Sequence, residues 1–456
     1  MADMTASTLE PLEPASHSWV GGLRLQGSLY STHYTALAFL LAVCIPSVPR
    51  KSILRYGLLL LQMTCVWQGF VAPPPPVSDS AILYTSGVLM ANLLARYFDR
   101  LYTVIPEESF HRITSTHPQN KEDATTLPVT QRLAWSLELF SVTRGIGWNW
   151  RVSGVPKFTA PKSRSRFVTA QLLTLIAMYA GLYLVEVVCQ ELLAASPSPV
   201  ITTTTTPGNE IQIPTLLRDL LLYALIVLGL ALVVYSHFAI FVLPLSILCV
   251  GLQVGPVAWR DMSAWPPDYG SLREAYSLRR FWGITWHQQL RRQTGAPGAY
   301  LLSFLPEGVR TSKRRLARLI RRYLLLVTAF VVSGWIHTSG SYHVSRGLGL
   351  PVSYGGEVKY FLSQAISVML EDLGCWLLGM DDRSAAEVSL LRRWVGYVVT
   401  ASWYFWSRVH WSVVPVAVAS GIQDARGPLF VALEHTRRSA QAVPGNFVAT
   451  AWKTFL

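Results

Sequence analysis

Long apolar runs with few charges are the feature that most restricts what this chain can fold into. A helix needs about 17–25 mostly apolar residues to cross a hydrocarbon core of roughly 30 Å. The runs lie near 34–48, 53–71, 81–101, 167–193, 216–252, 323–337, 360–379 and 394–418. The sequence therefore predicts an all-α, polytopic transmembrane helical protein with about eight spans.

The composition agrees with a membrane location. Only 14% of the 456 residues are charged, whereas a soluble domain carries about 25%. So few charges could not cover the surface of a soluble protein. No secretory signal precedes the runs, because the first thirty residues are polar and contain proline. We expect a polar N-terminal tail at 1–33, one multi-span membrane domain at 34–418 and a C-terminal tail at 419–456.

Three of the predicted spans have unusual lengths. The runs at 34–48 and 323–337 are short for a crossing. The run at 216–252 is long enough for a spanning helix and an interfacial piece, with a break expected at Pro244. The number of spans is therefore predicted as about eight, with a range of one or two on either side.

The basic residues are distributed unevenly between the loops. The segments 102–166 and 254–322 are rich in Lys and Arg, whereas 72–80 and 194–215 contain neither. The positive-inside rule then puts both basic segments in the cytosol and 194–215 in the lumen. The formal charge of +13 is thus mostly a signal of topology. No folded basic module is recognisable, so nucleic-acid binding is not expected.

An ionisable residue inside an apolar run is rare and usually functional, and His337 is the best candidate. It closes the run Tyr323–His337, YLLLVTAFVVSGWIH. A helix starting at Tyr323 would put it about 21 Å along, past the midplane. Ser333 and Gly334 would lie on the same face and leave room beside the imidazole. The alternative is a histidine at a span end that reaches the interface near Ser339 and Ser341. His343, six residues further on, is expected in a luminal loop.

The basic segment contains a second candidate site at 277–292, SLRRFWGITWHQQLRR. If it is helical, Trp282 and Trp286 share one face. Arg280, His287 and Arg291 then form a second stripe. Aromatic and guanidinium groups side by side suit an anionic ligand with an apolar tail. The alternative is an amphipathic interfacial helix.

Motifs for other chemistries are missing from the sequence. There is no GxSxG, no HExxH and no Gly-rich phosphate loop. None of the five cysteines belongs to a CxxC pair, so neither a metal site nor a disulfide framework is expected.

The stretch RFWGITWHQ at 280–288, followed fifty positions later by SGWIH at 333–337, resembles the membrane-bound O-acyltransferase (MBOAT) family. The resemblance is to its wax-synthase-like branch, and within it to fungal acetyltransferases of terpenoid and meroterpenoid pathways. The segment RGIGWNWRVSGVP at 144–156 also resembles these fungal members. The likeness covers roughly 90–410. It implies an MBOAT-like fold with His337 at the invariant intramembrane histidine and His287 at the second catalytic position.

The resemblance also implies a reaction. Acetyl-CoA would be the co-substrate, without a bound cofactor, and the acceptor would be a hydrophobic alcohol. His337 would act as general base, while Arg280, Trp282, Trp286, Arg291 and Ser333 would bind CoA or substrate. Cytosolic access to CoA suits a multi-pass protein of the endoplasmic reticulum.

Two other functions stay open at the level of sequence. One is a long-chain wax-ester synthase, which a wide lateral opening to lipid would favour. The other is a membrane transporter, which would use paired charges inside its spans. Arg96, Glu186, Glu371 and Asp372 are such charges, interpreted here as span-end or helix-packing residues.

Overall fold

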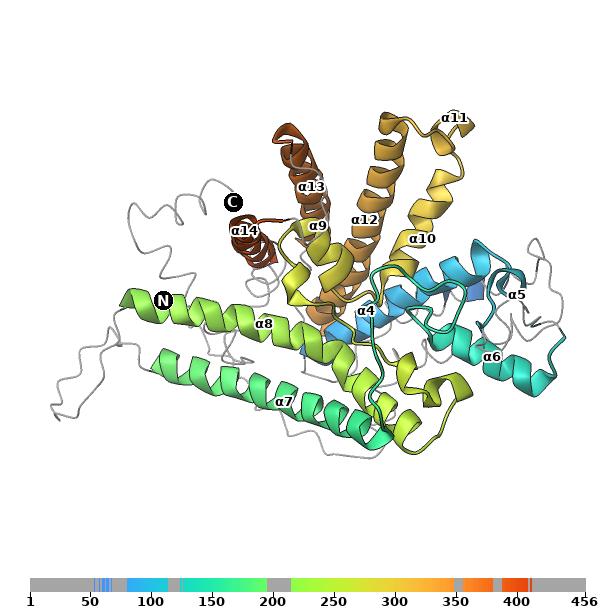
Figure 1. Ribbon diagram of the computed structural model, residues 1–456, viewed down its shortest axis with the longest axis horizontal. Coiled ribbons are helices and arrows are strands. Elements are labelled where there is room, and N and C mark those ends of the chain that lie inside the picture. The colour runs from blue at the N-terminus through green and yellow to red at the C-terminus, as the bar shows by residue number, and fades with distance from the viewer. Residues whose placement is uncertain are drawn as a thin grey trace, which may run out of the picture.

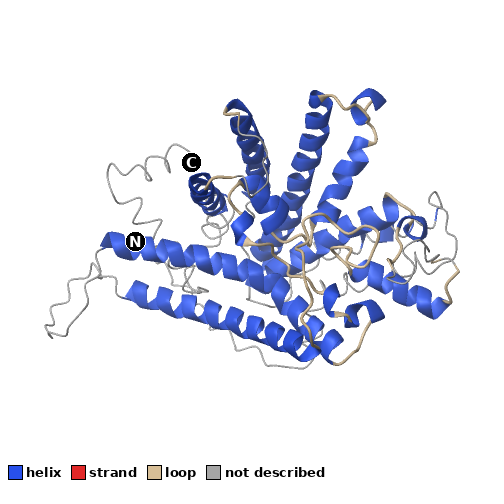
Figure 2. Ribbon diagram, viewed as in Figure 1, coloured by secondary structure: helices blue, strands red, loops and turns tan. Residues whose placement is uncertain are grey.

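The computed structural model describes residues 80–113, 126–194, 215–347, 356–379 and 388–408, together with isolated positions within 53–67 and at 124 and 411. Within these ranges the chain is helical and has no strand (Figure 2). The predicted span at 34–48 and both tails lie outside the described residues, as does most of the span at 53–71. The prediction of an all-α fold is confirmed for the remainder.

Six helices form the body of the structure (Figure 1). They are α4 (Ser80–Tyr97), α7 (Arg164–Ala194), α8 (Thr215–Ser246), α12 (Arg315–Gly347), α13 (Gly356–Leu377) and α14 (Leu390–Arg408). Shorter pieces connect them: η1 (Phe98–Tyr102), α5 (Pro106–Ser109), α6 (Val129–Ser141), η2 (Ile247–Gly251), η3 (Val257–Arg260), η4 (Met262–Ala264), η5 (Leu272–Glu274), α9 (Leu278–Arg280), η6 (Phe281–Thr285), α10 (Arg291–Leu302) and α11 (Glu307–Arg310).

The predicted spans agree with these helices except at two places. The short run at 323–337 belongs to α12, a helix of 33 residues, because small and polar residues after His337 continue it to Gly347. The break expected at Pro244 is absent, since α8 runs through this proline and ends in the π-helix η2.

By length and composition, two of the described helices could cross a bilayer, over Arg164–Val185 and Arg315–Arg346. A shorter apolar helix covers Phe238–Gly251. The count of eight spans therefore remains a prediction.

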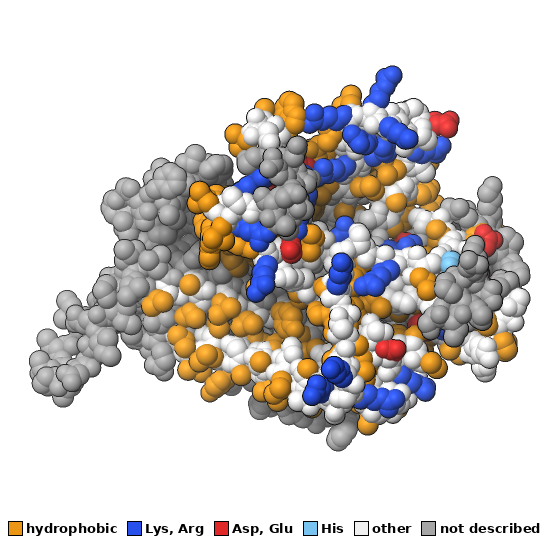
Figure 3. Space-filling view, viewed as in Figure 1, with side chains coloured by type: hydrophobic (Ala, Val, Ile, Leu, Met, Phe, Trp, Pro, Cys, Tyr) orange, Lys and Arg blue, Asp and Glu red, His pale blue; other side chains and the backbone are white. Residues whose placement is uncertain are grey.

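The helices α7 and α8 form a long antiparallel hairpin (Figure 1). Met178, Ala239 and Leu243 are buried between them. Leu173 and Ile176 of α7 point outward with 60% and 62% of their surface exposed. Figure 3 shows hydrophobic side chains spread over this hairpin. An apolar outer face of this kind suits contact with lipid.

Helix α12 is the centre of the packing, and glycines allow its neighbours to come close. A Cβ on Gly87 of α4 would lie 2.2 Å from the carbonyl oxygen of Ser339, and one on Gly340 would lie 2.8 Å from the Tyr84 ring. Small residues at such crossings let helix backbones approach. The crossing brings Tyr84 against the last third of α12, at His337 and Gly340.

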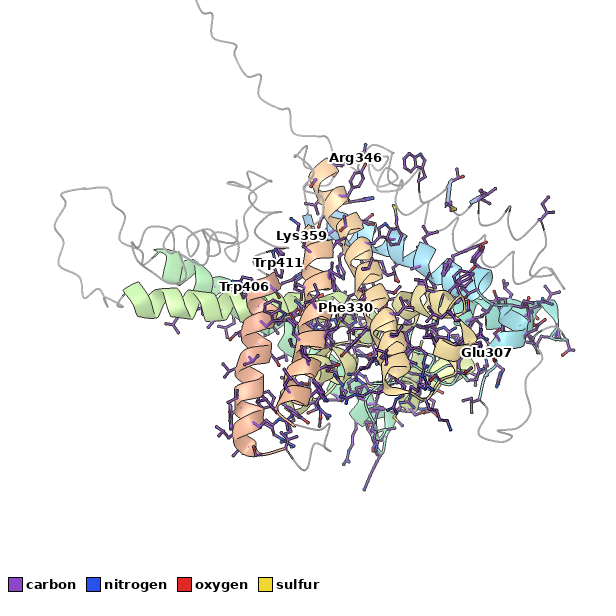
Figure 4. All side chains as sticks on the ribbon, turned by 90° about the horizontal axis from the view of Figure 1, so that it is seen from above. Glu307, Phe330, Arg346, Lys359, Trp406 and Trp411 are labelled. Atoms are coloured by element: carbon purple, nitrogen blue, oxygen red, sulfur yellow. The ribbon has the colours of Figure 1, made fainter. Side chains whose placement is uncertain are left out.

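Helices α12, α13 and α14 alternate in direction. At one end of the bundle, Tyr323 near the start of α12 donates to Asp372 near the end of α13 at 3.2 Å. At the opposite end, Arg408 at the end of α14 donates to Glu357 near the start of α13 at 2.9 Å, on the side where Figure 4 labels Lys359 and Trp406. Residues far apart in sequence therefore meet at each end.

The basic segment between α4 and α7 is a packed layer. Its core contains Phe110, Trp135, Leu139 and Trp148. Arginines pair with carboxylates around it, as Arg112 does with Glu138 at 2.7 Å. Some of the basic residues that were attributed to membrane topology therefore also stabilise this layer.

Candidate active site

A cavity of about 2000 Å³ runs along one side of α12. Seven of its lining residues follow a single helical stripe: Arg322, Leu326, Ala329, Ser333, His337, Ser341 and Val344. At 1.5 Å per residue, this stripe is about 33 Å long, which is close to the thickness of a bilayer core of about 30 Å. The cavity can therefore take a long ligand, or two ligands that meet end to end.

His337 lies on this stripe, twenty-two positions after the start of α12. Its Nδ1 is 2.7 Å from the Tyr84 hydroxyl, and its ring stacks on Phe361 with centroids 4.8 Å apart. Contacts from α4 and α13 thus fix the plane and position of the imidazole. The alternative of a histidine at a span end is wrong, because α12 continues for ten residues beyond it.

A buried carboxylate lies behind this pair. The Tyr84 hydroxyl donates to Oε1 of Glu357 at 3.4 Å, and Arg408 of α14 donates to Oε2 at 2.9 Å. Glu357 is only 4% exposed. Three helices therefore contribute to a chain of polar groups that ends at His337.

The second motif does not form the continuous helix expected at 277–292. The three-residue helix α9 passes into the π-helix η6, and the chain becomes extended at Trp286, with φ −66° and ψ 149°. The stripe of Arg280, His287 and Arg291 therefore does not exist. Local spacing could not predict this break, because contacts from other segments stabilise it.

Two glycines allow those segments to reach the turn. A Cβ on Gly270 would lie 2.2 Å from the Ile284 oxygen, and one on Gly154 would lie 2.5 Å from the Gly283 oxygen. Gly154 also has φ +89°, a conformation that residues with a Cβ rarely adopt. The segment 144–156 therefore packs directly on the second motif. This contact is a structural reason why both segments belong to the same sequence pattern.

The motif's tryptophans form part of the cavity wall. Their rings lie 5.2 Å apart, and Trp282 also meets Phe330 edge-on at 5.3 Å. Phe330 lies midway along α12 (Figure 4). Trp282 and Trp286 thus come together as expected, although the π-turn rather than a helical face brings them there.

His287 lines the same cavity as His337. Its ring packs against Phe238 and Tyr269, with centroids 4.4 and 5.7 Å away. Its Nδ1 is buried without a hydrogen-bond partner in the part of the chain that the structure describes. Burial, reinforced by repulsion from His337 and Arg144, lowers the pKa of His287 to about 3, so this ring is neutral at physiological pH.

The two arginines of the motif have different positions. Arg280 pairs with Glu274 and stacks over Tyr276 at 4.9 Å, and it is not among the cavity residues. Arg291 lines the cavity and donates to the carbonyl oxygen of Gly283 at 2.9 Å. The structure therefore brings Arg291, but not Arg280, to the site.

Of the other residues predicted near His337, Gly334 and His343 differ from expectation and Ser333 does not. Ser333 lines the cavity, with its hydroxyl bonded to the Ala329 carbonyl at 2.9 Å. Gly334 does not open space beside the histidine, because a Cβ there would lie 2.8 Å from Val358 Cα; it serves the packing of α12 on α13. His343 is inside α12 and 8% exposed, so the prediction of a luminal loop is wrong.

The sequence analysis missed Tyr84, Glu357 and Arg408. Glu357 opens an apolar helix and Arg408 closes another. Charges at helix ends resemble ordinary interfacial residues, so the sequence alone does not identify Glu357 and Arg408 as site residues. Glu371, in contrast, has the expected packing role, since it accepts from the backbone nitrogens of Leu278 and Arg279 at 2.9 and 3.0 Å.

Comparison with known proteins supports the sequence motifs. Residues 265–354 match the profile of the Membrane bound O-acyl transferase family. The O-mevalon transferase yanI of Aspergillus niger is 79% identical over 99% of both chains. The O-mevalon transferase macI of Penicillium terrestre is 57% identical, also over 99% of both.

More distant relatives have a different name. The acetyltransferase AOL_s00215g273 of Arthrobotrys oligospora is 26% identical over 88% of this chain and 84% of its own. No solved structure matches the chain.

Proposed function

This chain belongs to the membrane bound O-acyl transferase family and is an O-acyltransferase, and from that premise we propose its reaction. It moves an acyl group from a coenzyme A thioester to a hydroxyl of a hydrophobic secondary metabolite, a terpenoid or meroterpenoid. The observation that carries the proposal is His337, held at Nδ1 by Tyr84 at 2.7 Å inside a long cavity.

The acyl group is the first point to decide. Acetyl-CoA is the donor that the sequence motifs imply, but the identities to relatives named acetyltransferases are 25–29%. The two relatives that match end to end are named O-mevalon transferases. We therefore favour a mevalonyl thioester as donor and keep acetyl-CoA as the second candidate. Polar groups near His337 suit the extra hydroxyls of a mevalonyl chain, since Ser333, Ser341 and Glu357 all line the cavity.

The two ligands would approach from opposite ends of the cavity. Arg279, Arg291 and Arg322 line the cavity, and Arg279 and Arg322 come together on Asp372 at the end of the cavity where α12 begins. These guanidinium groups suit the phosphates of CoA, because charge-assisted hydrogen bonds are the strong ones. The hydrophobic acceptor would lie toward Ser341 and Val344. We propose that the protein is multi-pass in the endoplasmic reticulum, with this basic end in the cytosol, where the CoA thioester would enter.

The chemistry requires one base and no covalent enzyme intermediate. The acceptor oxygen bonds to the thioester carbonyl carbon while its proton passes to Nε2 of His337. The resulting intermediate collapses as the C–S bond breaks. The CoA sulfur leaves with that proton, which restores the neutral imidazole. General-base help of this kind is worth about 10²–10⁴-fold in rate.

His287 has a different role in this proposal. With its pKa lowered to about 3, it is a neutral hydrogen-bonding group and not a cation. Its ring lines the cavity beside Trp286 and is suited to position the substrates. Trp282 and Trp286 supply the apolar wall beside it.

The experiment measures CoA release by membranes that contain the protein, with farnesol as a probe acceptor. Mevalonyl-CoA, acetyl-CoA and palmitoyl-CoA are compared as donors. We expect acceptor-dependent release, fastest with mevalonyl-CoA. A preference for palmitoyl-CoA would instead identify a long-chain wax-ester synthase.

His337→Ala tests the base, and His111→Ala is its control. His111 lies outside the cavity, and its backbone nitrogen and carbonyl oxygen both pair with Asn149. With matched expression, His337→Ala should lose about 10²-fold or more in kcat, and His111→Ala should retain it. Unchanged turnover in His337→Ala would overturn the mechanism.

A further inference from the structure

We propose that Tyr84 and Glu357 are positioning residues that hold the proton of neutral His337 on Nδ1, so that Nε2 is its basic nitrogen. This inference rests on the proposed role of His337 as general base. The three groups come from α12, α4 and α13 and form one hydrogen-bonded chain.

The direction of the chain follows from counting protons. An ionised carboxylate can only accept hydrogen bonds, and a tyrosine hydroxyl has a single proton to donate. The Tyr84 hydroxyl donates to Glu357 at 3.4 Å. Its oxygen must then accept at 2.7 Å from His337, so Nδ1 has the N–H. The lone pair of the neutral ring is therefore on Nε2.

Glu357 is held in its ionised form by its surroundings. Arg408 donates to it at 2.9 Å, and the carboxylate side chain is 4% exposed. A buried charge persists where it is paired and hydrogen-bonded. When His337 takes the acceptor proton, the imidazolium is connected through Tyr84 to this carboxylate. The chain thus both orients the base and stabilises its charged form.

The geometry of Tyr84 is enforced by packing. Its ring lies over Gly340, where a Cβ would be 2.8 Å from Tyr84 Cδ2. The 3.4 Å bond to Glu357 is long, but catalytic hydrogen bonds often shorten once substrate is bound. Small movements of α4 would change the distance between Tyr84 and His337 directly.

A purely structural role for Glu357 is the competing explanation. In that case its pair with Arg408 only joins α13 to α14. Removing either partner would leave the other charge buried and unpaired, which strongly destabilises the fold. Tyr84→Phe separates the two explanations, because it keeps the aromatic ring and the ion pair while removing the hydroxyl.

The test compares Tyr84→Phe with Tyr397→Phe in the CoA-release assay, with mevalonyl-CoA, acetyl-CoA and farnesol as probes. Tyr397 is outside the cavity, and its hydroxyl donates to the Arg273 carbonyl at 2.7 Å. We expect Tyr84→Phe to lower kcat about tenfold or more and to leave KM for the donor within about threefold. Tyr397→Phe should retain both.

The pH profile gives a readout that packing alone would not move. Tyr84 contacts His337 directly, with Glu357 and Arg408 behind it, and His287 and His337 repel each other electrostatically. Losing the connection to the carboxylate disfavours the imidazolium, so the acid limb of kcat/KM should move to lower pH in Tyr84→Phe.

Two outcomes would overturn the inference in distinguishable ways. Wild-type kcat and an unmoved acid limb in Tyr84→Phe, with His337→Ala inactive, would refute the positioning chain and leave His337 as the base. An active His337→Ala would refute the proposed base itself, and the chain with it.

Discussion

Gly87→Ala should impair catalysis without touching the substrate. Gly87 lies one helical turn from Tyr84, at the crossing of α4 and α12. The added Cβ would be 2.2 Å from the Ser339 backbone oxygen, and backbone cannot rotate away. Reaching an ordinary contact of 3.4 Å requires the helices to separate by about 1.2 Å.

That separation decides the size of the effect. The bond between Tyr84 and His337 measures 2.7 Å, and the same displacement takes it past the limit of about 3.5 Å for a hydrogen bond. We expect kcat to fall about tenfold, the effect of roughly 1.4 kcal/mol at the transition state. Overpacking should also cost about 1–3 kcal/mol of stability.

The assay is CoA release in membranes, together with thermal unfolding in detergent. Gly374→Ala is the matched control, because it lies in α13 with nothing within 4 Å of the added Cβ. It should retain kcat and unfold at the same temperature or slightly higher, since alanine favours helices. Wild-type kcat and stability in Gly87→Ala would refute the argument that this crossing sets the position of Tyr84.

Three further predictions concern the arginines, His287 and the topology. Arg291→Ala should raise the KM for the CoA donor, whereas Arg280→Ala, outside the cavity, should not; equal effects on KM would contradict the difference in their placement. Because burial lowers the pKa of His287 from 6.5 to about 3, the unfolded chain binds a proton there at higher pH than the folded protein. The stability that neutral His287 contributes is thus fully present above about pH 6.5 and is lost as the pH falls toward 3. In thermal unfolding, His287→Asn should therefore lose less stability than the wild type over this pH range, and an identical loss would exclude His287 as its origin. Cysteines placed at Thr204 and Arg314 should be labelled from opposite sides of the membrane, and labelling from one side would reject the topology.

The long apolar helices were predictable because their cause is local. A run of apolar residues can be identified directly in the sequence, so α7 and α13 begin and end close to the expected residues. The helix containing His337 was predicted too short, since most of its last ten residues are small or polar and several of them, such as Ser339 and Ser341, are buried by packing. The family and the enzyme class also followed from the sequence, because the two histidine motifs keep their content and order.

The site itself depends on contacts between residues that are far apart in the chain. The distance in sequence from Tyr84 to His337 is 253 positions, and no local pattern connects them. The turn at Trp286 likewise exists because Gly154 and Gly270 let distant backbone approach it. Helical spacing placed Arg280 beside His287, whereas the turn removes Arg280 from the cavity.

The sequence by itself determined which segments are apolar helices and which two histidines are the catalytic candidates. Only the tertiary structure decided what surrounds those histidines, including the carboxylate of Glu357 behind Tyr84. The physical reason is one of range. Helix formation and lipid partition depend on neighbouring residues in the chain, while the orientation of a base depends on hydrogen bonds that form only after separate helices have packed together.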